Sequence, residues 1–150
     1  MRLRDFFDPA AISLALTGGS KDQVLAEMAG LLGVDERSQS IILRLVERRE
    51  QLGSTGIGRG VAVPHCRTLV VGRLRVAFGR HLQGIDFDAI DHRPVNSVFL
   101  IVAPPAEVAN QYLAVLGKIA QLAKDAEVPD RLARLTTVDE FLDLLDEKTA

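Results

Sequence analysis

The sequence predicts an α/β fold in which helices cover both faces of a central sheet. Segments with strand-like patterns alternate along the chain with segments of helical periodicity, which is typical of this class. Residues 95–102 are apolar at almost every position, as expected for a central strand buried on both faces. Two of the helical segments begin with capping sequences, which locate their starts.

The composition fits one soluble globular domain, which we expect to span residues 1–150. A net charge of −2 gives no electrostatic basis for binding nucleic acid. No apolar run approaches the roughly 18 residues that cross a bilayer, and no apolar core follows the basic N-terminus, so we expect neither membrane insertion nor secretion. The single cysteine, Cys66, cannot form an internal disulfide, which fits a reducing cytoplasm.

The first part of the chain predicts one strand and two helices. Residues 12–16 alternate large and small side chains, as in a strand buried mainly on one face. Ser20 and Gln23 form a capping box that opens a helix, and Gly33 ends it. A second helix begins near Asp35. Its predicted inward-facing residues are Ile41, Ile42, Leu45 and Val46.

The rest of the chain alternates strands with helices. The predicted strands are residues 61–63, residues 74–80 with one solvated face, and residues 95–102. The predicted helices are residues 106–126, a short segment at 131–135 after Pro129, and a final helix opened by the capping box of Thr137 and Glu140.

A glycine-rich loop, residues 53–60, carries the strongest indication of chemistry. Glycines allow backbone N–H groups to turn toward one point, which can bind an anion. The short strand after the loop ends at His65, and the helix before it ends near Arg49, whose planar donors suit a phosphate. Ser54 and Thr55 add hydroxyls. Together these residues favour a histidine that accepts a phosphoryl group over a purely structural one.

The loop does not match other common motifs. It lacks the Gly-Lys-Ser/Thr of a Walker motif, and it leads into a strand rather than the helix of a dinucleotide-binding turn. No G-x-S-x-G of a hydrolase is present. Cys66 directly follows His65, but adjacent side chains of a strand face opposite sides, so the two are poorly placed as a catalytic pair.

Two other groups of polar residues have simpler explanations. Asp86, Asp88, Asp91 and His92 could suggest a metal site, but oxygen-rich turns far more often form caps and solvated bends, so we predict no metal. His81 stands at a strand end among polar residues, and we expect it at the surface.

One stretch closely resembles the phosphorylation-site motif of the IIA proteins of the bacterial phosphotransferase system, namely Gly53-Ser54-Thr55-Gly56-Ile57-Gly58 followed by Pro64-His65. The branch is the fructose/mannitol type, and the Gly-Ser-Thr-Gly-Ile-Gly run is most similar to its nitrogen-regulatory members. Supporting similarity extends over nearly the whole chain, at residues 14–25, 87–95 and 99–104.

The resemblance implies a three-layer α/β/α sandwich with a mixed central sheet, and a phosphotransferase that needs no cofactor, metal or nucleotide. It implies that the ε nitrogen of His65 accepts a phosphoryl group from a phosphohistidine carrier protein of the HPr or NPr type, while a backbone carbonyl holds Nδ1. Arg49 is then the active-site arginine. The residues expected to support the phosphate are Ser54, Thr55, Gly56 and Gly58.

Tyr112 departs from the family pattern, because many members place a second histidine just before the Leu-x-x-Leu of the long helix. A phenol can donate a hydrogen bond to a phosphate but carries no charge near pH 7. Tyr112 therefore either substitutes in part for that histidine or is a core aromatic residue at helical spacing. Cys66 stands where glycine is common, and nothing in the sequence indicates the lowered thiol pKa of a redox site.

Three functions remain open from the sequence. The first is a regulatory phosphocarrier whose phosphorylated and unphosphorylated surfaces bind different target proteins. The second is a sugar-transport IIA protein that passes its phosphoryl group to a IIB domain of a permease. The third is a non-catalytic binding module of the same fold, which the presence of both Arg49 and His65 disfavours. We favour regulation, because no permease domain is fused to this sequence.

Overall fold

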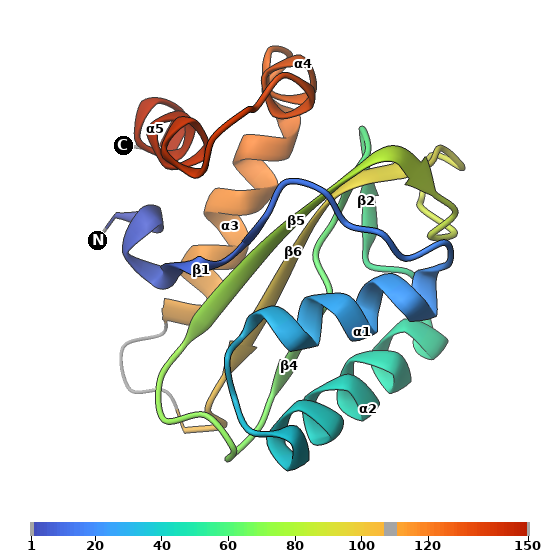
Figure 1. Cartoon of the computed structure of the whole chain (residues 1–150), viewed down its shortest axis with the longest axis vertical. Helices are drawn as coiled ribbons and strands as arrows, with labels where there is room; N and C mark the ends of the chain where they lie inside the picture. Colours follow the sequence, from blue (N-terminus) through green and yellow to red (C-terminus); the bar gives the residue numbers. More distant parts are fainter. Residues whose placement is uncertain (1, 107–110, 150) are drawn as a thin grey trace.

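A mixed sheet lies at the centre of the fold, with helices on both of its faces (Figure 1). The structure is a computed structural model and describes residues 2–106 and 111–149. The described strands are β1 (Phe7–Ser13), β2 (Gly56–Gly58), β3 (Val61–Ala62), β4 (His65–Arg67), β5 (Arg75–Ile85) and β6 (Val95–Ala103). The described helices are α1 (Lys21–Leu31), α2 (Glu36–Leu52), α3 (Gln111–Lys124), α4 (Val128–Ala133) and α5 (Val138–Thr149).

Strand directions make the sheet mixed, as the family resemblance implies. The order is β1-β5-β6-β3-β2, and β4 also pairs with β6. Strands β5 and β6 are antiparallel, whereas β1 runs parallel to β5, and both β3 and β4 run parallel to β6. Strand β3 pairs with the first half of β6 and β4 with its second half, where His65 lies opposite Ile101. The short strand β4 therefore places His65 at an edge of the sheet.

Two apolar cores fill the spaces between the layers. Residues of α3, α4 and α5 pack on one face, where the Phe78 and Phe141 rings stack with their centres 4.1 Å apart. Residues of α1 and α2 pack on the other face, around Met28 and Ile42. Strand β6 contributes alternate residues to both cores, which confirms the prediction of a central strand covered on both sides.

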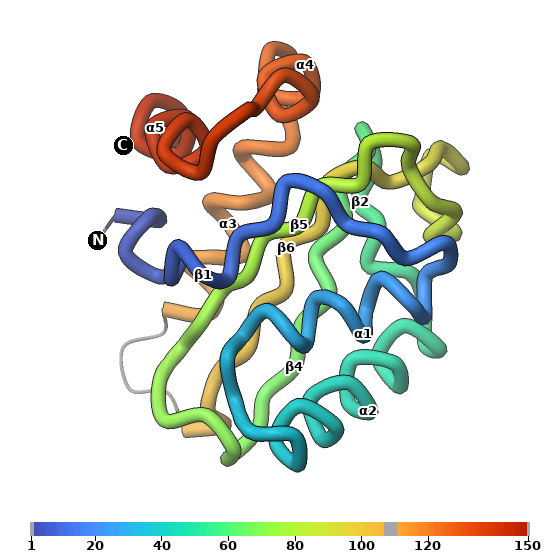
Figure 2. The backbone as a smooth tube through the Cα atoms, viewed as in Figure 1, coloured from blue at the N-terminus to red at the C-terminus, as the bar shows by residue number. Residues whose placement is uncertain are grey.

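The N-terminus and the C-terminal helix close one end of the molecule. A 3₁₀ turn, Leu3–Phe6, packs against α5 (Figure 2). Arg4 donates to the Asp146 carboxylate at 2.5 Å, and the apolar Leu3 side chain is buried. No helix of the described residues is long and apolar enough to cross a membrane.

The helix ends agree closely with the capping predictions. The Ser20 hydroxyl accepts from the backbone N–H of Gln23 at 3.2 Å, and Asp35 caps α2 in the same manner. Thr137 and Glu140 exchange hydrogen bonds at the start of α5, as a capping box requires. Residues 107–110 of the predicted long helix lie outside the described residues, and α3 is described from Gln111 to Lys124.

Three predicted segments were wrong in position or environment. The first strand is Phe7–Ser13 rather than 12–16, because an edge strand tolerates Pro9 and buries Phe7 and Ala11. Strand β5 has no solvated face over residues 76–81, since helices cover both sides of it. Helix α4 is Val128–Ala133 rather than 131–135, with its proline in the first turn, where a missing N–H costs nothing.

Candidate functional site

His65 lies half-buried in edge strand β4, with one of its ring nitrogens held by the backbone. Its Nδ1 lies 2.8 Å from the carbonyl oxygen of Val63. A carbonyl can only accept a hydrogen bond, so Nδ1 is the donor, and Nε2 is the ring nitrogen that this contact leaves unengaged. This contact confirms the expectation that a backbone carbonyl holds Nδ1. The contact therefore fixes the orientation of the imidazole ring and assigns Nδ1 as its donor to the backbone.

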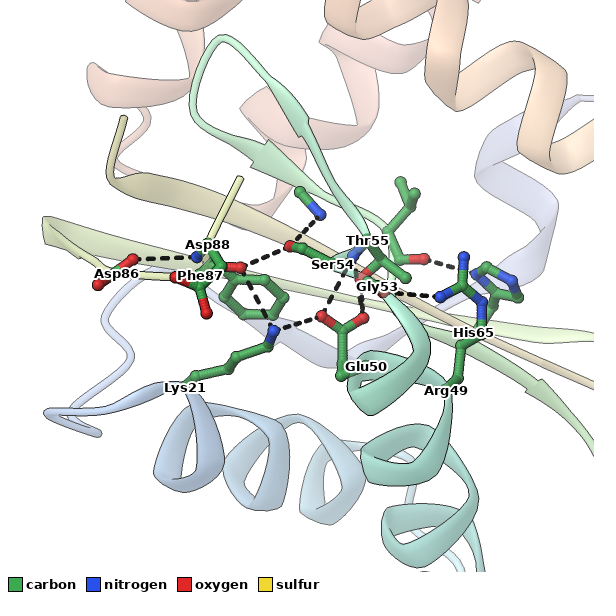
Figure 3. Close-up of polar contacts among 12 residues, drawn as sticks. Lys21, Arg49, Glu50, Gly53, Ser54, Thr55, His65, Asp86, Phe87 and Asp88 are labelled. Carbon is green, nitrogen blue, oxygen red and sulfur yellow. Dashed lines mark hydrogen bonds and ion pairs between the residues drawn. The ribbon is translucent and has the colours of Figure 1, made fainter. Parts of the chain in front are cut away.

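Arg49 comes to the site from the last turn of α2, which contacts β4. Its Nη1 donates to the carbonyl oxygen of Gly53 at 2.7 Å, and Figure 3 shows the guanidinium beside the imidazole of His65. Among the described residues Arg49 forms no ion pair with a carboxylate. The guanidinium therefore has donors to offer an incoming anion.

Tyr112 closes the other side of the site from α3. Its ring centre lies 6.0 Å from that of His65, with the rings edge to face, and the side chain is largely buried. Burial raises the pKa of the Tyr112 phenol, while the charges of Arg67 and Arg49 act in the opposite direction. The phenol is therefore neutral near pH 7, and both arginines lie close enough to act on it.

Arg67 is a residue of the site that we did not predict from the sequence. Its guanidinium carbon lies 4.3 Å from the centre of the Tyr112 ring, and its Nη1 donates to the carbonyl oxygen of Pro105 at 3.3 Å. The same strand alternation that separates Cys66 from His65 places Arg67 on the His65 side. That alternation was the signal that could have identified it.

A buried carboxylate supports the loop that leads to His65 (Figure 3). Glu50 accepts from the backbone N–H of Thr55 at 3.1 and 3.2 Å, and also from the Thr55 hydroxyl. The carbonyl oxygen of Thr55 accepts from the N–H of Val63 at 2.9 Å, and the Val63 carbonyl holds His65. Lys21 forms an ion pair with Glu50 at 2.7 Å. A continuous series of hydrogen bonds thus joins α1 and α2 to the imidazole.

Ser54 and the glycines of the loop make their contacts within the protein. The Ser54 hydroxyl donates to the carbonyl oxygen of Phe87 and accepts from the N–H of Gly56. A Cβ at Gly56 would lie 2.7 Å from the Cβ of Ala89, so only glycine fits there, and Gly58 has a φ of 98°. The expected phosphate-supporting roles of Ser54, Thr55, Gly56 and Gly58 remain predictions; here these residues shape the β2–β3 hairpin.

Cys66 faces away from the site, into the core beneath α1 and α2. Burial raises the pKa of its thiol to about 12, so the reactive thiolate is scarce near neutral pH. The expectation for His81 was wrong: it is buried, and its Nε2 donates to the carbonyl oxygen of Gly18 at 2.7 Å. His81 lies within β5, which continues to Ile85, and the turn at Gly18 covers it, a contact that the polar neighbours in sequence do not reveal.

The acidic loop between β5 and β6 is held by its own hydrogen bonds. Asp86 accepts from the N–H of Asp88 at 3.0 Å, and Asp91 accepts from the N–H groups of Arg59 and Arg93. These two backbone hydrogen bonds lower the pKa of the Asp91 carboxyl. In the described part of the chain, no three His, Cys, Asp or Glu residues are grouped to hold a metal ion.

A family model described as "Phosphoenolpyruvate-dependent sugar phosphotransferase system, EIIA 2" matches residues 5–148. The chain belongs to this family. It is 35% identical over 142 residues to a nitrogen regulatory protein of Pseudomonas aeruginosa, covering 93% of this chain and 91% of that protein. The EIIA 2 family proteins are phosphotransfer proteins, and the fold of this member agrees with solved relatives.

Two solved structures show the agreement in fold. The crystal structure of nitrogen regulatory protein IIA-Ntr from Neisseria meningitidis matches with a TM-score of 0.86 and 30% identity, over 95% of this chain and 98% of that one. The mannitol enzyme IIA of Escherichia coli, in a complex with phosphorylated mannitol enzyme IIB, matches with a TM-score of 0.76 and 25% identity, over 94% and 99% of the two chains.

We predict that Lys21→Ala lowers the free energy of unfolding by about 3 kcal/mol, because it leaves the buried Glu50 carboxylate without its cation. Urea denaturation measures the change. Lys124→Ala, which removes an exposed lysine of α3, is the matched control and should change stability by less than about 0.5 kcal/mol. Equal effects of the two substitutions would contradict a supporting role for the Lys21–Glu50 pair.

Proposed function

We propose that this EIIA 2 protein is a phosphocarrier that accepts a phosphoryl group on Nε2 of His65 from a phosphohistidine carrier protein of the HPr or NPr type. The hydrogen bond from His65 Nδ1 to the Val63 carbonyl carries the proposal, because it engages Nδ1 and leaves Nε2 as the ring nitrogen that can meet a phosphoryl group. The half-buried position of His65 on an edge strand also leaves it within reach of another protein.

In the proposed transfer, the Nε2 lone pair forms a bond to phosphorus as the bond from phosphorus to the carrier's histidine nitrogen breaks. The electron pair of the broken bond returns to that donor nitrogen. Each ring keeps the proton on its other nitrogen, so no proton has to move. Such a reaction asks the protein mainly to align donor and acceptor and to stabilise charge on the equatorial oxygens.

Arg49 is suited to the second of these tasks. Its guanidinium lies beside His65 (Figure 3), and within the described residues its hydrogen bond goes to the Gly53 carbonyl. A bidentate contact from this group would stabilise the oxygens of the transferring phosphoryl group. This pairing of arginine and histidine disfavours a non-catalytic binding module.

A regulatory output is the form of this function that we favour. Two relatives, from Pseudomonas aeruginosa and Bradyrhizobium diazoefficiens, are both named nitrogen regulatory proteins, and the chain covers 91% and 86% of their lengths. A doubly charged group on His65 would alter the surface that target proteins meet. The complex of the mannitol IIA and IIB enzymes supports the alternative, in which this chain passes its phosphoryl group to a IIB domain.

Exposed apolar side chains that are close in sequence to the site residues would give a carrier protein a surface on which to dock. Leu52 follows Arg49 by less than one helical turn and is 86% exposed, and Leu113 adjoins Tyr112 and is 65% exposed. Leu69, just after β4, is 87% exposed. Large apolar residues exposed around a polar centre are typical of protein interaction sites.

We predict that His65→Ala abolishes labelling by radioactive phosphoenolpyruvate in the presence of enzyme I and the carrier protein. The label on the wild-type chain should be acid-labile, as a phosphorus–nitrogen bond requires. His92→Ala removes an exposed histidine and serves as the control. Equal labelling of the wild-type and His65→Ala chains would exclude His65 as the acceptor.

We predict that Arg49→Ala slows single-turnover phosphoryl transfer by roughly 100-fold, because a donor to the transferring group is lost. Rapid-quench measurement at saturating phosphorylated carrier gives the rate constant. Arg48→Ala removes an exposed charge from the same turn and should leave the rate constant unchanged. If both substitutions behave alike, Arg49 only stabilises the end of α2.

We predict that Leu113→Ser raises the KM for the phosphorylated carrier by about tenfold and leaves the transfer rate at saturation unchanged, because only apolar docking area is lost. Steady-state labelling over a range of carrier concentrations separates the two quantities. Leu82→Ser, at a comparably exposed leucine of β5, is the control. A KM that does not change would place the docking surface elsewhere.

A further inference from the structure

Arg67 and Tyr112 form a pair on the open side of His65. We propose that Arg67 is a second cationic ligand of the phosphoryl group, and that the ring of Tyr112 holds its guanidinium in place. This inference rests on the proposed function, in which His65 is the phosphoryl acceptor. It gives the site two guanidinium groups, one from α2 and one from β4.

The geometry of β4 puts Arg67 on the side of the strand where His65 reacts. Side chains two residues apart on a strand share a face and are roughly 7 Å apart at their Cα atoms. Cys66, between them, is buried in the core beneath α1 and α2, whereas Tyr112 belongs to the core on the opposite face. His65 and Arg67 therefore both project toward Tyr112.

Tyr112 contacts both residues. Its ring centre lies 6.0 Å from the His65 ring centre and 4.3 Å from the guanidinium carbon of Arg67. A guanidinium over an aromatic face is attracted by the negative charge of that face, and the flat contact limits how it can turn. The ring therefore keeps an otherwise exposed and flexible side chain close to the imidazole.

Arg67 retains donors for a phosphate. Within the described residues its guanidinium donates only to the Pro105 carbonyl, at a long 3.3 Å, and forms no ion pair. A guanidinium has five N–H donors, so most remain available. An anionic phosphoryl group would be a far stronger partner than a carbonyl.

The Tyr112 phenol is poorly suited to supply a positive charge in place of the second histidine that many family members have at this position. Burial raises the pKa of Tyr112, so its hydroxyl stays neutral near pH 7. Arg49 and Arg67 both influence this phenol electrostatically, so both positive side chains lie near it. The phosphoryl group on Nε2 of His65 would thus lie near two cations, with Tyr112 as the platform for Arg67.

The test measures single-turnover transfer from the phosphorylated carrier by rapid quench. Arg67→Ala should lower the rate constant at saturating carrier by about tenfold, and Arg67→Lys should recover part of the loss because charge is restored without the planar donors. Arg73→Ala, which removes an exposed arginine outside the site, should match the wild-type chain.

Substitutions of Tyr112 test the platform. Tyr112→Phe keeps the ring and should stay within about twofold of the wild-type rate constant, whereas Tyr112→Ala should approach the loss seen with Arg67→Ala. The double variant Arg67→Ala/Tyr112→Ala should be no slower than Arg67→Ala alone, because the ring acts through the arginine. Circular dichroism and urea denaturation identify any variant that fails to fold.

Each outcome decides between the two proposals. A wild-type chain that takes no label overturns the proposed function itself. A labelled wild-type chain with Arg67→Ala equal to Arg73→Ala overturns only the role of Arg67. A change in KM without a change in the rate constant at saturating carrier would make Arg67 a docking residue, and would also overturn its role as a ligand of the phosphoryl group. Equal losses in Tyr112→Phe and Tyr112→Ala show that the hydroxyl, and not the ring, matters.

Discussion

The hydrogen bond between His65 Nδ1 and the Val63 carbonyl is the interaction on which the site depends. It is formed across a single residue, Pro64, whose own carbonyl accepts from the N–H of Ile101 at 3.0 Å. The backbone that fixes the tautomer is therefore itself fixed to the central strand. The Glu50 carboxylate extends this support through Thr55 to Val63. The contact between His65 and Val63 is thus held in place by both the central sheet and helix α2.

Lys21 gives the buried carboxylate its counter-charge and also ties it to the acidic loop. Its ammonium pairs with Glu50, donates to the Phe87 carbonyl at 3.3 Å and lies 4.7 Å from the centre of the Phe87 ring. Ser54 donates to the same carbonyl. Because an ion pair removed from water requires close geometry to be stable, these contacts constrain how the glycine loop can move.

Local sequence signals predicted the parts of the fold that depend on local physics. Helix caps such as Ser20 depend on residues three positions apart, and β6 shows burial on both faces in its own composition. The identities of His65 and Arg49 came from the family resemblance and from the chemistry of a glycine loop. Strand alternation also indicates that Arg67 shares a side with His65. The contact of its guanidinium with the Tyr112 ring, which only the structure shows, is what connects Arg67 with the site.

Other features arise from tertiary contacts that the sequence does not show. Glu50 is a charged residue near the end of a helix, where side chains are usually exposed, yet the returning loop buries it and makes it a hydrogen-bond acceptor. His81 is buried by segments distant in sequence, including Gly18. Strand β1 begins earlier than its alternation suggests, because pairing with β5 decided the register.

Both arginines of the site rest on backbone carbonyls, Arg49 on Gly53 and Arg67 on Pro105. A carboxylate in place of either carbonyl would compete with a phosphate for the guanidinium. A neutral carbonyl is a weaker acceptor, so the guanidinium can leave it for a phosphate at little energetic cost. The unphosphorylated and phosphorylated forms of such a site can then lie close in free energy. Phosphoryl transfer through such a site would be reversible, and its direction would follow the relative abundance of phosphorylated donors and unphosphorylated acceptors in the cell.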